Sequence, residues 1–192
     1  MNSLPRDHNV IPVPQTARVD LAAADVVRIW EAVVAGVVEY GFTVSFAELA
    51  PPQTGTFDGH EIVLNPANPL EMQCFLLLHL FGHSVQWVAP SLRPTIASIE
   101  DSPDLETFLR DLRQYESEAA QFGLQLLHEV GVMDCDQWLS DFAATDWRYV
   151  ARYYREGEIP PLNECEASGA PMIEPKAIPP LEHRRVEVRF AF

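Results

Sequence analysis

Apolar residues recur at helical spacing in four stretches of this 192-residue chain, and polar residues fill the positions between them. Spacings of three and four residues place the apolar side chains of a stretch on one face, which is the pattern of a helix that packs on a core. The pattern predicts helices over residues 21–40, 69–88, 104–130 and 134–157. The second of these is apolar almost all round, so we expect it to be the central helix.

Shorter stretches alternate between apolar and polar residues, which is typical of strands with one buried face. Residues 42–46 and 61–64 follow this pattern and are separated by prolines and glycines. They predict two strands that form a hairpin or a small antiparallel sheet. Residues 183–192 alternate as well, and we expect this final strand to join the small sheet or to pair with a second copy of the chain.

Prolines and capping residues mark the borders of these elements. Asn68, Pro69 and Glu71 stand where a helix N-cap, first position and third position are expected, so they predict a capping box at the start of the central helix. We therefore expect an α+β fold in which helices pack on a small antiparallel sheet. Its predicted parts are an extended arm over residues 1–16, one domain over 17–157, and a proline-rich arm with the final strand over 158–192.

The overall charge restricts the class of partner. The chain carries a formal net charge of −15, which argues against binding to nucleic acids or anionic membranes through bulk charge. No apolar run is long enough to span a membrane, and the first residues lack the apolar stretch of a signal peptide. Cys74, Cys135 and Cys165 are three widely spaced cysteines, a number and spacing that favour reduced thiols and a cytoplasmic location.

The central helix carries a pair of candidate metal ligands. His79 and His83 are four residues apart, so both imidazoles lie on one helix face and can meet at one ion. Glu116 falls within the apolar stripe of the next helix, where a carboxylate needs an ion, a proton or a hydrogen-bond donor. Two histidines and one carboxylate form a zinc-ligand set that leaves a fourth place for water. In a zinc peptidase, a glutamate after the first histidine acts as general base, but here that position is Leu80.

Three segments of the chain together resemble the ImmA/IrrE-type zinc metallopeptidase domain, over roughly residues 21–130. They are the Phe-Asp-Gly-His-Glu-Ile-Val-Leu-Asn stretch at 57–65, the Phe-Leu-Leu-Leu-His-Leu-Phe-Gly-His stretch at 75–83, and the Tyr-Glu-Ser-Glu-Ala-Ala-Gln-Phe-Gly-Leu-Gln-Leu-Leu stretch at 115–127. The matching positions are Gly59, Ile62, Leu64, Asn65, His79, Gly82, His83, Glu116, Ala119, Phe122, Leu126 and Leu127.

The resemblance implies a zincin-like fold with zinc bound by His79, His83 and Glu116. The chain departs from the pattern at Leu80, which replaces the catalytic glutamate, and at Ala120, which replaces the usual asparagine. The usual Met-Pro after the paired leucines is also absent. Without a general base, the rate of hydrolysis falls by about 10²–10⁴. We therefore do not expect this chain to have the proteolytic activity of the family that it resembles.

Three functional hypotheses follow. The first is a catalytically inactive, peptidase-derived protein that keeps zinc as a structural or sensing centre and acts in regulation through a protein or peptide partner. The second is an active zinc metallopeptidase with a displaced general base, for which Glu61, Glu71 and Glu118 are the candidates. Glu71 lies two helical turns before His79, too far to reach the metal directly. The third is a metal-free interaction protein in which both histidines hydrogen-bond to Glu116.

Three further residues lie near the candidate ligands in the sequence. We interpret Cys74 as a buried thiol, because it lies off the ligand face, and His60 as an exposed loop histidine. Gln86 follows His83 on the same helix face, where its amide has the reach to orient a ligand.

Overall fold

The computed structural model describes residues 21, 23–50, 53–92, 99 and 102–185. In chain order its elements are α1 (Ala23–Glu39), β1 (Thr43–Phe46), β2 (Gly55–Phe57), β3 (Glu61–Leu64), α2 (Leu70–Val88), α4 (Leu105–Glu129), α5 (Asp136–Glu156) and the short 3-10 helix η1 (Leu162–Glu164). The α+β class and the four predicted helices are therefore confirmed. None of the helices in these residues is long and apolar enough to cross a membrane.

The sheet is mixed, so the predicted hairpin or antiparallel sheet is wrong. Its strand order is β1-β3-β2, with β1 parallel to β3 and β2 antiparallel to β3. Strand β2 was not predicted from the sequence. A tight turn joins β2 to β3, because the Asp58 carboxylate accepts the amides of His60 and Glu61 and Gly59 adopts a φ of 82°. This hairpin occupies one edge of β3, and β1 pairs in parallel with the other edge.

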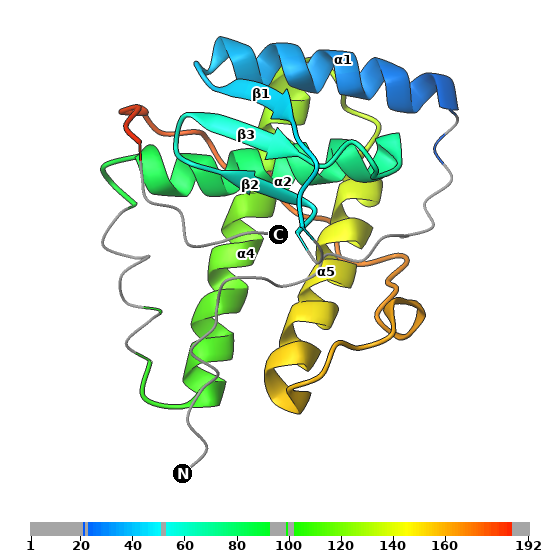
Figure 1. The fold of residues 1–192 in the computed structure, drawn as a ribbon, viewed down its shortest axis with the longest axis vertical. Helices are drawn as coiled ribbons and strands as arrows, with labels where there is room; N and C mark the ends of the chain where they lie inside the picture. Colours follow the sequence, from blue (N-terminus) through cyan, green and yellow to red (C-terminus); the bar gives the residue numbers. More distant parts are fainter. Residues whose placement is uncertain (1–20, 22, 51–52, 93–98, 100–101, 186–192) are drawn as a thin grey trace.

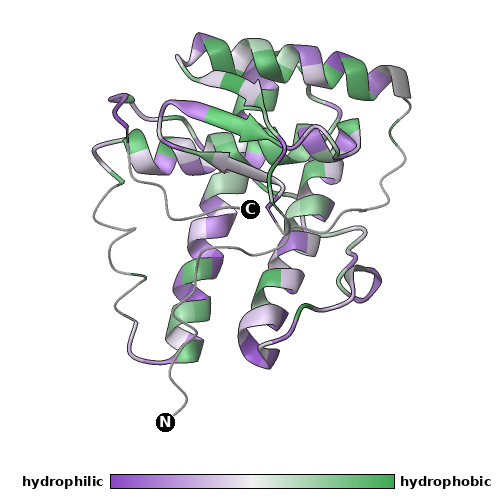
Figure 2. Ribbon diagram, in the orientation of Figure 1, coloured by the Kyte–Doolittle hydropathy of each residue, from purple (hydrophilic) through white to green (hydrophobic). Residues whose placement is uncertain are grey.

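Helix α2 is the centre of the molecule, as its apolar sequence predicts. It packs against α1, α4 and the β2–β3 side of the sheet, and Figure 1 shows α4 and α5 running side by side away from it. Figure 2 shows that hydrophobic and hydrophilic residues interchange along α1 and α4, as expected of helices with one buried face. The largest fully buried side chains come from α1, the sheet, α2 and α4: Ile29, Phe57, Ile62, Leu64, Phe75, Leu76, Leu77, Leu78, Leu80, Phe81, Leu109 and Phe122.

Helices α2 and α4 cross with their backbones in contact. A Cβ placed on Gly82 would lie 2.1 Å from the carbonyl oxygen of Ala119, and one on Gly123 would lie 3.0 Å from that of Leu78. Any side chain at Gly82 would therefore force the two helices apart. This close crossing positions the last turns of α2 beside the middle of α4, where the candidate ligands stand.

The predicted capping box at the start of α2 is wrong. Pro69 is the N-cap, and no side chain caps the helix. Tertiary partners occupy the two residues instead: the Asn68 amide donates to the carbonyl of Thr54, and the Glu71 carboxylate accepts the indole N–H of Trp138. Local capping chemistry is worth about 1 kcal/mol, so buried polar contacts of this kind override it.

The segment after α5 lies against α5 and α4. Its backbone amides at Ala167, Ala170 and Ile173 donate to side chains of α5, and the amide of Lys176 donates to the carbonyl of Gln121 on α4. Residues 183–185 form no strand. The rest of the predicted final strand (186–192) and the predicted N-terminal arm (1–16) lie outside the described residues, and the proposed division into a domain and two arms stays a prediction.

Candidate metal centre

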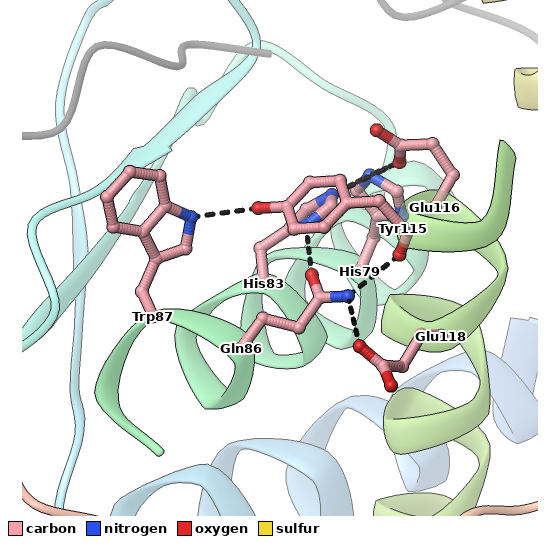
Figure 3. A network of polar contacts seen from close by, with 7 residues as sticks. All are labelled: His79, His83, Gln86, Trp87, Tyr115, Glu116 and Glu118. Carbon is pink, nitrogen blue, oxygen red and sulfur yellow. Dashed lines mark hydrogen bonds and ion pairs between the residues drawn. The ribbon is translucent and has the colours of Figure 1, made fainter. Parts of the chain in front are cut away.

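The structure brings together the three predicted ligands. One ligand atom from each of His79, His83 and Glu116 lies within 4.8 Å of the others. Nε2 of His83 is 3.0 Å from Nε2 of His79 and 3.2 Å from Oε2 of Glu116, and Nε2 of His79 is 3.4 Å from the same oxygen. All three residues are buried, with 4%, 0% and 8% of their surfaces exposed. Figure 3 shows both imidazoles of α2 turned towards the Glu116 carboxylate of α4.

These distances fit a single tetrahedral ion. Zinc bonds to histidine nitrogen and carboxylate oxygen are about 2.0–2.2 Å long, so neighbouring ligands of a tetrahedral zinc lie about 3.3 Å apart. The three observed separations of 3.0, 3.2 and 3.4 Å bracket that value. Because two imidazoles and one carboxylate supply three ligands, a fourth position is left for a small ligand.

The protonation states also suit metal binding, because ligands must be free of protons. Burial, followed by the neighbouring charge of His83, lowers the pKa of His79 from 6.5 to about 3. Burial alone would raise the pKa of Glu116, but the charge and hydrogen bond of His83, together with the charge of His79, outweigh it and leave this pKa below its usual value. At neutral pH His79 is therefore neutral, as a metal-binding imidazole must be.

Gln86 fixes the tautomer of His83. Its side-chain nitrogen donates to the carbonyl of Tyr115 at 2.8 Å and to the carboxylate of Glu118 at 3.0 Å. Since both partners accept, the amide oxygen must be the atom that lies 2.8 Å from Nδ1 of His83. Nδ1 therefore carries the proton, and the lone pair of Nε2 points to the ligand cluster (Figure 3). The expected contact between Gln86 and a ligand histidine is present.

Two aromatic side chains lie close to parallel with the His83 ring. The ring of Tyr115 stacks on that of His83 with centroids 4.7 Å apart, and the Tyr115 hydroxyl accepts the indole N–H of Trp87 at 2.8 Å. The ring of Phe57 is parallel to His83 within 8° at 6.4 Å. Neither Tyr115 nor Trp87 was predicted as part of the site. Tyr115 directly precedes a candidate ligand, but aromatic residues at helical spacing are more often ordinary core residues.

Position 80 belongs to the hydrophobic core. Leu80 is completely buried. Its side chain packs on Gly55 of β2, where an added Cβ would lie only 2.8 Å from Cδ1 of Leu80. The two helical candidates for a displaced base have other partners. Glu71 accepts from Trp138, whereas Glu118 binds Gln86 and forms an ion pair with Lys176.

A cavity of about 400 Å³ adjoins the ligand cluster and is lined by a carboxyl group that was not predicted from the sequence. His79 and Glu116 form part of its wall, and Asp146 of α5 forms another part. Asp146 is only 4% exposed, and burial, followed by the charge of Glu116, raises its pKa well above the usual value. Its spacing from Phe142 and Tyr149 on the buried face of α5 was the feature that could have revealed it.

The minor candidates lie away from the cluster. Cys74 is a buried thiol that donates to the carbonyl of Val26, and burial raises its pKa to about 12. Cys135 and Cys165 are also free and buried. His60 is exposed, as expected, with its ring 5.9 Å from that of His183.

Comparison with protein-family models, with curated proteins and with solved structures found no match to this chain. What the structure supports is therefore narrower than the motif resemblance. It is a buried group of two histidines and one glutamate, in an α+β fold, with the arrangement needed to hold a metal ion.

Proposed function

We propose that this protein binds one zinc ion through His79, His83 and Glu116 and uses it as a structural or sensing centre, without peptidase turnover, in a regulatory role exercised through another protein. The observation that carries the proposal is the set of 3.0–3.4 Å separations among three buried ligand atoms. Leu80 directly follows His79, where a peptidase of the resembled class has its catalytic glutamate. The peptidase-like ancestry rests on the motif resemblance alone.

The donor set disfavours magnesium and calcium, and zinc is the transition metal that we propose for it. Imidazole nitrogen suits zinc, copper, iron and nickel, whereas magnesium and calcium prefer sites made of oxygen alone. Zinc also accepts the tetrahedral arrangement that the three separations match. The Gln86 hydrogen bond to His83 is the kind of outer contact that ligand histidines in metal sites usually have. When bound, zinc would supply a Lewis acid beside the cavity.

The lack of turnover follows from position 80. A hydrolase of the resembled class needs a carboxylate there to accept a proton from water, and Leu80 instead packs against the sheet. General-base catalysis contributes about 10²–10⁴ in rate. A site that keeps its ligands and loses this group retains binding but little hydrolysis.

A regulatory role through a protein contact is supported by two features. The segment over residues 168–173 borders the cavity and is held to α5 by hydrogen bonds to Ser140 and Asp141, so the state of the metal can influence its position. The second feature is a set of exposed apolar side chains on α1 and β1, namely Val27, Val38 and Phe46, which a partner protein would cover.

Metal analysis and a cleavage assay test the proposal together. Purified protein should contain one zinc per chain by elemental mass spectrometry, and His83→Ala and Glu116→Gln should lose it. Incubation with casein should give no chelator-sensitive cleavage. Wild-type protein that takes up no zinc would favour the metal-free hypothesis, and robust cleavage abolished by chelator would favour the active peptidase with a displaced base.

A further inference from the structure

The segment that follows α5 is attached to the helices by separate hydrogen bonds and not as part of a helix or sheet. Residues 166–182, all of which the structure describes, contain no helix or strand and no backbone hydrogen bond among themselves. Four of their amides, spaced three residues apart, donate to α5 and α4 instead: those of Ala167, Ala170, Ile173 and Lys176. We call residues 166–176 the strap.

The strap can move away from the helices at a small cost. None of residues 166–182, a range described throughout, is buried, and Met172 is 66% exposed. Segments with few buried contacts and solvent-exposed hydrogen bonds open locally, without unfolding of the whole protein. Residues 168–171 and Ile173 also form one wall of the cavity beside the ligand cluster. Opening of the strap would therefore expose this cavity to solvent.

Lys176 attaches the end of the strap to α4 by its charge as well as by its amide. Its ammonium group forms an ion pair with Glu118 and lies 5.6 Å from the centre of the Phe122 ring. It is the only lysine of the sequence, so amine chemistry can address this contact selectively among the side chains.

Glu118 continues the path from Lys176 to a metal ligand. It accepts the side-chain N–H of Gln86 at 3.0 Å, and the oxygen of the same amide lies 2.8 Å from Nδ1 of His83. A cation at Nε2 draws electron density from the imidazole, so Nδ1 donates its proton more strongly. Hydrogen bonds in series strengthen one another, and the effect extends to Glu118 and its ion pair. A segment that can open locally is thus connected to the ligand cluster.

We propose that the strap transmits the state of the metal site to the protein surface: the Lys176–Glu118 ion pair holds it closed while His83 binds a metal, and it opens more often without the metal. The inference rests on the proposed function and deepens it, because it assigns the segment through which a metal-sensing protein presents its state to a partner. Opening changes the surface that a partner meets, since it uncovers the oxygen acceptors of Ser140, Asp141 and Thr145.

Hydrogen exchange of the four strap amides, followed by NMR in the intact 192-residue chain, tests the proposal. Zinc added to metal-free wild type should slow this exchange by about fivefold or more, the lower end of the usual coupling between two sites. It should also slow the acetylation of the Lys176 side chain by an amine-selective reagent, because the closed strap keeps the ammonium group paired with Glu118.

Two substitutions of Lys176 separate its charge from its bulk. Lys176→Gln removes the charge, so in chelator its strap amides should exchange about two- to fivefold faster than those of wild type, the worth of an exposed ion pair. Zinc should slow them less than in wild type. Lys176→Arg keeps the charge and should match wild type. Arg155→Gln is the control, because it breaks another exposed ion pair, between the last turn of α5 and Glu106 in the first turn of α4.

The outcomes distinguish this proposal from the metal centre. Strap exchange that is the same in Lys176→Gln and wild type would overturn the role of Lys176. Zinc bound at one per chain without any slowing of the strap amides would overturn the coupling and leave the metal centre standing. Failure of wild type to bind zinc would overturn the metal centre and the coupling together.

Discussion

The side-chain oxygen of Gln86 lies 2.8 Å from Nδ1 of His83, and this contact determines which nitrogen of the imidazole is available to a metal. The orientation of Gln86 is itself fixed, because its nitrogen donates to Tyr115 and Glu118. Glu118 is paired in turn with Lys176. A chain of polar contacts thus runs from the segment after α5 through α4 to His83 of α2.

Removal of the Gln86 amide should weaken metal binding. Gln86→Leu leaves Nδ1 of His83 without its acceptor, so the imidazole is free to change tautomer and orientation. Loss of such an outer contact typically costs about 10–100-fold in metal affinity. The zinc dissociation constant, measured by competition with a chromophoric chelator, should rise by that factor.

The matched control is Gln125→Leu. Gln125 also lies in a helix, but its amide donates only to Glu129 on the surface of α4. The zinc affinity of the Gln125→Leu variant should equal that of wild type. Equal affinities for Gln86→Leu and Gln125→Leu would show that the tautomer of His83 does not depend on Gln86.

Because α2 and α4 cross closely, we predict that alanine destabilises the protein much more at Gly82 than at Gly123. In Gly82→Ala the new Cβ would meet the backbone of Ala119 at 2.1 Å, and backbone cannot move aside as a flexible side chain can. We expect a loss of about 3 kcal/mol or more in the free energy of unfolding, measured by urea denaturation. Zinc affinity should fall as well, because His83 and Glu116 come from the two helices that separate.

Gly123→Ala is the milder comparison at the same crossing. Its Cβ would stand 3.0 Å from the carbonyl oxygen of Leu78, and alanine regains up to about 1 kcal/mol in helix propensity. It should cost clearly less stability than Gly82→Ala. Equal losses for both variants, or none for Gly82→Ala, would contradict the described helix contact.

The buried carboxyl of Asp146 should make the metal-free protein less stable as pH rises. Its pKa is raised well above the ordinary value of 3.8, so above that pH the folded chain keeps a proton that the unfolded chain releases. The stability that this proton contributes is present below about pH 4 and is lost as pH rises towards the folded-state pKa. The corresponding slope is at most about 1.4 kcal/mol per pH unit.

Asp146→Asn has no proton to lose. In the presence of a chelator, the variant should therefore become more stable relative to wild type as pH rises from about 4 to 7. Urea denaturation of both proteins at several pH values measures the difference. Parallel stability curves would mean that Asp146 is ionised in the folded protein.

The sequence predicted the helices and the ligand cluster because both depend on periodicity. A spacing of four residues places His79 and His83 together on any helix, and the apolar stripe of α4 directs Glu116 inward. The capping box at Asn68 failed because the side chains of Asn68 and Glu71 have tertiary partners, which no local pattern contains.

The sheet and the cavity depend on contacts that the sequence does not express. Strand β2 has only three residues, too few to show alternation, and without it the parallel pairing of β1 with β3 could not be foreseen. The position of Asp146 on the buried face of α5 was readable from the sequence, but the cavity that it lines together with Glu116 was not. The function of the cluster is the part that the sequence leaves most open, since Leu80 removes the usual inference from the histidine pair.

Anomalous diffraction at the zinc edge, from crystals of protein purified without added chelator, tests the central claim most directly. We predict a single peak about 2.0–2.2 Å from Nε2 of His79, Nε2 of His83 and Oε2 of Glu116. The absence of any peak there in zinc-soaked crystals, with the two imidazoles hydrogen-bonded directly to Glu116, would contradict the proposed metal centre.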